Sequence, residues 1–200
     1  MILPIYLYGA PVLRKIAEEV DVENTDWKPL VADMYETMYH AGGVGLAGPQ
    51  IGKAIRLFVI DSEPFKEAFP NVQIFKSAFI NPIITEEWGE DFVFGEGCLS
   101  LPHINEDVTR KSNIHVEYYD ENGTFHESDF NGLVARIIQH EYDHLDGKVF
   151  VDHLSPIKKM VLKKEIQGVI NSDIPDKEII LNSLKGALPT VYKKINKKEY

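Results

Sequence analysis

The pentapeptide His140-Glu141-Tyr142-Asp143-His144 constrains the fold of this chain more than any other feature. Its histidines lie four residues apart, so an α-helix would place both imidazoles on one face, one turn apart. The flanking sequence predicts such a helix over residues 131–145, because apolar residues recur at helical intervals and Gly147 follows them. These residues are Leu133, Val134, Ile137, Ile138 and Leu145. The two histidines are either ordinary helix residues or ligands of one metal ion, with Glu141 beside it to transfer protons.

A catalytic metal site usually has three protein ligands, so the two imidazoles require a third ligand from elsewhere in the chain. The only cysteine, Cys98, is the best candidate for the third. A single cysteine cannot form an internal disulfide, which favours a reducing compartment and leaves packing, a reactive thiol or metal binding as its roles. The sequence around Cys98 predicts a shaped loop or an edge strand, because glycines flank Glu96 and Pro102 follows four residues after the cysteine.

A third segment, residues 42–52, is dense in glycine. It does not end in the Gly-Lys-Ser/Thr of a phosphate loop, and no strand-to-helix pattern surrounds it, so nucleotide binding is disfavoured. We expect either a plain turn between a helix and a strand, or a loop whose backbone approaches a ligand. In the second case, Gln50 is the side chain that can donate a hydrogen bond to that ligand.

Length and charge limit the remaining possibilities. A chain of 200 residues, 44% of them hydrophobic, can bury one sizeable core. The net charge of −10 argues against general affinity for nucleic acid, although residues 185–200 carry five lysines and one glutamate. We find neither a signal peptide nor a membrane-spanning stretch, and we expect a cytoplasmic protein without specific DNA binding.

The coarse pattern of helices and strands predicts an α+β fold. An amphipathic helix is expected over residues 27–41, and another over 156–167. A hairpin is expected across residues 120–123, which contain Asn122-Gly123. The predicted strands are 56–61, 72–84, 91–94, 113–119 and 124–130.

Three motifs, in this order, resemble those of the peptide deformylase family: GVGLAGPQ at 43–50, EGCLSLP at 96–102 and QHEYDHLDG at 139–147. The resemblance covers about residues 1–168. It implies a catalytic domain over 1–168, a C-terminal extension over 169–200, and mixed, mainly antiparallel sheets packed around a central metal-binding helix.

The resemblance also implies roles for particular residues. Cys98, His140 and His144 would hold a ferrous ion, which Zn²⁺, Ni²⁺ or Co²⁺ could replace. Glu141 would act as general base and then as general acid. Gln50 and the backbone N–H of Leu99 would donate hydrogen bonds to the oxyanion.

The implied substrate is the N-formyl group on the initiator methionine of a nascent polypeptide, released as formate. The backbone at Gly43 and Gly45 could pair with an extended peptide, and Val44, Leu133 and Ile137 could line an apolar pocket for the methionine. The basic C-terminal end could contact the ribosome near its exit tunnel, or could be a solvated tail.

Several details depart from the family pattern or stay open. Gly48 replaces a common alanine and is expected to loosen its turn, and residues 103–106 (His-Ile-Asn-Glu) lack the arginine of many relatives. Glu96 is expected to pair with Arg110, either to brace the cysteine loop or as an exposed pair. Two other classes are a zinc peptidase with Glu165 as third ligand, and a structural metal site closed by a fourth protein ligand.

Overall fold

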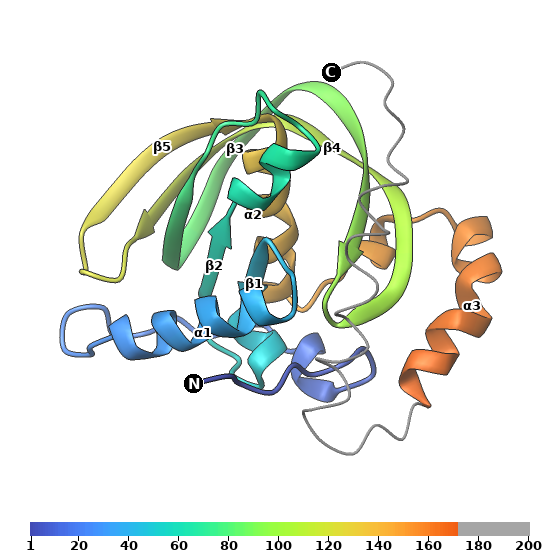
Figure 1. Cartoon of the computed structure of the whole chain (residues 1–200), viewed down its shortest axis with the longest axis horizontal. Helices are drawn as coiled ribbons and strands as arrows, with labels where there is room; N and C mark the ends of the chain where they lie inside the picture. Colours follow the sequence, from blue (N-terminus) through green and yellow to red (C-terminus); the bar gives the residue numbers. More distant parts are fainter. Residues whose placement is uncertain (172–200) are drawn as a thin grey trace.

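The computed structural model describes residues 1–171 of the chain (Figure 1). The predicted basic segment 185–200, and with it the proposed ribosome contact, lies outside the described residues. Most of the extension predicted over 169–200 does so as well.

A five-stranded antiparallel sheet forms the framework, with its strands in the order β1-β2-β3-β4-β5. One isolated parallel bridge joins Glu18 to Ile55 beside it. The α+β fold is confirmed, and antiparallel pairing dominates as predicted. The strands are β1 (Gly45–Ala47), β2 (Leu57–Asp61), β3 (Lys76–Cys98), β4 (Leu101–Tyr119) and β5 (Phe125–Asn131).

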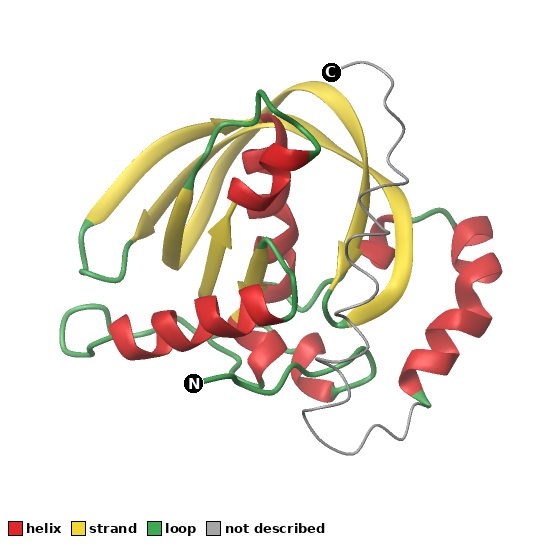
Figure 2. Cartoon of the chain, in the orientation of Figure 1, coloured by secondary structure: helices red, strands yellow, loops and turns green. Residues whose placement is uncertain are grey.

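Strands β3 and β4 form a long bent ribbon that ends at Cys98 (Figures 1 and 2). The prediction of two separate strands, 72–84 and 91–94, was wrong. The pairing register shifts at several places along the ribbon, and Gly89 has a left-handed backbone with φ +85°. Such irregularities bend a strand without ending it, so one strand spans residues that look interrupted in the sequence.

The predicted hairpin is confirmed. Strands β4 and β5 pair from Tyr119 with Phe125 to Asn113 with Asn131. Asp120 accepts backbone hydrogen bonds from Asn122 and Thr124, and Gly123 has φ +77°. The turn therefore uses the local side-chain bond and the positive φ that its sequence favours.

Three α-helices accompany the sheet: α1 (Lys28–His40), α2 (Gly132–Leu145) and α3 (Pro156–Ile170). The predictions for α1 and α2 are correct to within one residue at each end. Helix α3 extends three residues beyond its prediction, and Gly168, the predicted domain boundary, lies inside it. None of the described helices has the length and apolar character needed to cross a membrane.

Helix α2 lies at the centre of the molecule, and the sheet curves around it (Figure 2). It contacts β1, β2, β4 and β5. Val134 and Ile138 on α2 pack in one buried cluster with Phe58 and Phe79 of the sheet. Burial of one such side chain contributes about 1.5–3 kcal/mol to stability, so this packing fixes the helix that carries the two histidines.

Helix α1 and the glycine-rich segment close the other side of β1 and β2. Met34 and Met38 of α1 are fully buried against Leu57 and Val59. After α1 the chain passes through β1 and the 3-10 helix η2 (Gly48–Ile51). A Cβ atom at Gly48 would lie 2.9 Å from the Ile55 carbonyl oxygen, so this glycine allows a close backbone approach and does not loosen the turn.

Candidate metal centre

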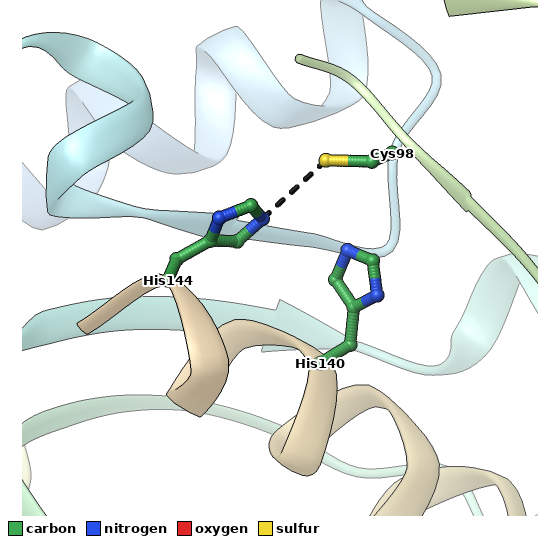
Figure 3. A group of neighbouring side chains, drawn as sticks. All are labelled: Cys98, His140 and His144. Carbon is green, nitrogen blue, oxygen red and sulfur yellow. Dashed lines mark hydrogen bonds between the residues drawn. The ribbon is translucent and has the colours of Figure 1, made fainter. Parts of the chain in front are cut away.

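Cys98, His140 and His144 converge on one point (Figure 3). The cysteine ends β3, and both histidines lie on the same face of α2. One ligand atom from each residue lies within 4.8 Å of the others, and Cys98 Sγ lies 3.4 Å from His144 Nε2. The structure thus brings together the three residues that the sequence singled out.

The donor atoms fit a transition-metal ion. A tetrahedral ion with bonds of about 2.0–2.3 Å places its ligand atoms roughly 3.3–3.7 Å apart, and the spacing of Cys98 Sγ and His144 Nε2 is of this size. One thiolate and two imidazoles suit iron, zinc, nickel or cobalt, whereas magnesium and calcium prefer oxygen ligands.

A buried carboxylate fixes the orientation of His140. His140 Nδ1 lies 2.9 Å from Glu96 Oε2, which leaves Nε2 facing the donor group. Arg110 donates to both oxygens of Glu96, through Nε at 2.7 Å and Nη2 at 3.0 Å, and Arg136 Nη1 donates to Oε1 at 2.8 Å. The predicted Glu96–Arg110 pair is confirmed, and it is buried rather than exposed. Such a carboxylate partner is typical of metal-binding histidines.

The charges of this cluster stabilise one another. Burial opposes the ionised thiolate, but the imidazoles of His144 and His140 outweigh it and lower the pKa of Cys98 to about 5. Burial likewise opposes ionisation of Glu96, yet its bonds from His140 and Arg110 hold the pKa of this carboxyl well below its usual value. Cys98 is therefore set to bind as a thiolate.

Glu141 faces the same space from α2. Its side chain is buried, and Oε2 has no hydrogen-bond partner within the described part of the chain. Burial raises the pKa of Glu141 to about 7, against the opposing charges of His140 and His144. A carboxyl group with a pKa near neutrality can both accept and return a proton.

Gln50 approaches from η2. Its Oε1 accepts the backbone N–H of Ala47 at 2.8 Å, which identifies the other amide atom as the nitrogen. Nε2 then points to Ser100 Oγ at 3.3 Å and Cys98 Sγ at 3.5 Å. The amide donor thus lies beside the thiolate, and Leu99, the next residue after Cys98, lies in the turn that follows β3.

A cavity opens next to these groups. Of the predicted substrate-binding residues, Gly43, Val44, Gly45 and Ile137 line it. Leu133, one helical turn earlier on α2, does not line the cavity and packs against the cluster around Phe58 and Phe79. Apolar residues that sequence reasoning missed also line the cavity: Phe65, Phe94, Leu101 and Ile104.

The two alternative metal sites receive no support. Glu165 is exposed on α3 and does not belong to the ligand group. In the described residues this group has three members, whereas a closed structural site needs a fourth. The three donors beside an open cavity are typical of a catalytic site.

The family model described as polypeptide deformylase matches residues 2–160 of the chain. The chain belongs to this family. The peptide deformylase of Flavobacterium psychrophilum is 49% identical over 85% of this chain and 91% of its own length. The Thermotoga maritima peptide deformylase structure is 40% identical, with a TM-score of 0.69 over 78% of this chain and 99% of that one.

A third relative is the peptide deformylase of Synechococcus elongatus, whose structure was solved in complex with actinonin. It is 38% identical, with a TM-score of 0.73 over 82% of this chain and 87% of that one. Membership in the polypeptide deformylase family makes the chain a metal-dependent hydrolase that deformylates nascent peptides. The three ligand candidates and Glu141 all lie within the matched residues.

Proposed function

We propose that Cys98, His140 and His144 hold one ferrous ion, and that the chain removes the N-formyl group from the initiator methionine of nascent polypeptides as formate. The proposal rests on one observation above others: the thiol and two imidazoles face Glu141 and Gln50 beside a mostly apolar cavity. A divalent cation held there would supply Lewis acidity that activates water and polarises the formyl carbonyl.

Glu141 accepts a proton from the attacking water while the water oxygen forms a bond to the formyl carbon. The carboxylate is buried at the cavity wall, so it needs no rearrangement of bulk solvent to take this proton. The C–N bond then breaks, formate leaves, and Glu141 returns the proton to the amine. General acid and base catalysis of this kind typically contributes 10²–10⁴-fold.

Gln50 Nε2 and the backbone N–H of Leu99 donate hydrogen bonds to the oxyanion in the tetrahedral transition state. The bond from Ala47 N–H to Gln50 Oε1 orients the amide before substrate arrives. Loss of one such oriented donor in comparable sites costs about 2.7–4 kcal/mol.

The apolar wall of the cavity accommodates the methionine side chain. Val44 and Ile137 contribute to it, together with Phe65 and Phe94. The peptide that follows can add as an extended strand beside residues 43–45, where glycine leaves the backbone accessible. His103 and Asn105, which also line the cavity, then contact positions after the methionine.

Formylated peptides are expected to be turned over at least about a hundredfold faster than acetylated ones. The extra methyl group of an acetyl group must fit between Glu141, Gln50 and the ligands at the cavity wall, and a 1 Å misplacement of the carbonyl can lower the rate by about 10²-fold. The measurement is release of formate or acetate from formyl-Met-Ala-Ser and acetyl-Met-Ala-Ser. Equal rates would overturn the substrate assignment.

The identity of the native metal has a separate test. Protein purified without oxygen is expected to lose activity in air, because a ferrous ion on a thiolate is readily oxidised. Protein reloaded with Ni²⁺ is expected to keep its activity over the same exposure. Equal stability of the two preparations in air would count against iron. A reducing cytoplasm, which we propose as the location, suits such a site.

Gly45→Ala is expected to lower kcat by roughly 10–100-fold at unchanged metal content. A Cβ atom at this position would come within 2.7 Å of Glu141 Cδ, and the buried carboxylate must shift to avoid it. Gly95→Ala is the matched control, since its Cβ would meet Asp107 Oδ1 at 3.7 Å, an ordinary contact. Similar kcat values for the two variants would show that the position of Glu141 is less critical than proposed.

A further inference from the structure

The 3-10 helix η4 (Phe150–His153) packs against α2. Two of its side chains reach the metal helix. The fully buried ring of Phe150 stacks on His140, with ring centroids 6.1 Å apart and planes at 26°. His153 Nε2 lies 2.7 Å from Asp143 Oδ2. The first contact is apolar packing on a ligand, and the second begins a polar connection to that same ligand.

The polar connection runs without a break from His153 to His140. Asp143 Oδ2, which faces His153, also accepts Arg110 Nη1 at 2.8 Å. The other two nitrogens of Arg110 bond the two oxygens of Glu96, and Glu96 Oε2 bonds His140 Nδ1. Every link is 3.0 Å or shorter, so each side chain limits the orientation of the next.

Burial increases along this connection from His153 to Glu96. The side chain of His153 is 34% exposed, Asp143 is 12%, Arg110 is 6% and Glu96 is 3%. Inside the protein these charged hydrogen bonds are strong and directional, whereas at the surface water competes with them. His153 occupies the boundary and shields the Asp143 carboxylate from water at the point where it meets Arg110.

We infer that His153 is a positioning residue for His140, acting through Asp143, Arg110 and Glu96. Its Nε2–H and Arg110 Nη1 converge on one oxygen of Asp143 and hold that carboxylate in place. Without His153 the carboxylate can turn toward solvent. Arg110 then loses the anchor that keeps its planar group aligned with Glu96, and His140 loses part of the restraint on its ring.

The test measures how firmly the ligands hold a metal, and it rests on the proposed role of His140 as one of them. The full chain is loaded with Co²⁺, and loss of the ion to excess chelator is followed by the thiolate-to-cobalt absorption. His153→Leu is expected to lose cobalt roughly three- to tenfold faster than wild type. This is less than the 10–100-fold cost typical when a direct partner of a ligand is removed.

Two further variants separate the hydrogen bond from packing. His153→Gln can still donate to Asp143 and is expected to lose cobalt nearly as slowly as wild type. His153→Asn is too short to reach Asp143 and is expected to behave like His153→Leu, so the test stands even where the leucine variant folds poorly. Fast loss from the glutamine variant, or slow loss from both others, would overturn the inference.

His126→Leu is the matched control. His126 is 38% exposed and bonds Asp120 at 2.9 Å, much as His153 bonds Asp143, but it lies at the β4–β5 hairpin. It is expected to leave cobalt loss unchanged, and an equal acceleration there would also overturn the inference. Failure of wild type to bind cobalt through its thiolate would instead contradict the proposed metal site, so the two failures are distinguishable.

Discussion

Glu141→Gln is expected to lower kcat for formyl-peptide hydrolysis by about 10³-fold while the metal remains bound. The amide has nearly the shape of the carboxylate but cannot accept the proton of the attacking water. A loss of this size corresponds to about 4 kcal/mol in the activation free energy. Formate release and metal content, measured on the same samples, test both halves of the prediction.

Glu165→Gln provides the control for this experiment. Glu165 is exposed on α3 and is the ligand that a zinc peptidase of this type would need there. We expect the activity and metal content of the Glu165→Gln variant to match those of wild type. A Glu141→Gln variant that kept activity within tenfold of wild type would remove Glu141 from the proposed mechanism.

Cys98→Ala should have the second large effect, on metal binding itself. The two imidazoles would remain, but the metal would lose the thiolate ligand, whose ionised form His144 and His140 stabilise by lowering its pKa. Removing a direct ligand should cost more than removing one of its hydrogen-bond partners, so we expect metal affinity to fall by more than roughly a hundredfold. Metal analysis after gel filtration, with formate release on the same fractions, measures this loss.

Ser100→Ala is the control for Cys98→Ala, because it removes a buried hydroxyl from the same turn and leaves all three ligands in place. We expect this variant to retain its metal. If Cys98→Ala kept a full complement of metal, the thiol would have to be assigned to packing, which was one of the sequence-based alternatives.

The sequence predicts the elements whose patterns are local. The histidine spacing of α2, the apolar repeat around it and the Asn122-Gly123 turn each depend on neighbours within a few residues. Their helical or hairpin geometry follows without knowledge of the rest of the chain. For the same reason, α1 and α2 are found within one residue of their predicted ends.

Features that depend on distant residues could not be predicted in this way. Strand β3 continues across Gly89 because β4 pairs with it on both sides of this glycine, at Trp88 and again at Asp91, which a scan of one segment cannot reveal. Leu133 and Ile137 lie on the same face of α2, yet only Ile137 lines the cavity. The extent of the cavity along the helix depends on residues of other elements, which the helix sequence does not reveal. The sequence suggested that Glu96 pairs with Arg110 and that this pair could brace the cysteine loop, but it did not indicate that Glu96 contacts His140.

The two edges of the sheet have opposite chemistry, and this governs which chains can join it. The outer strand β5 carries His126, Glu127 and Asp129, and charged side chains on an edge discourage pairing with another copy of the protein. Strand β1, at the other edge, consists of Gly45, Leu46 and Ala47, carries no charge and borders the cavity. Unwanted sheet growth is thereby resisted at β5, while the uncharged edge borders the cavity in which we propose that the formylated peptide binds.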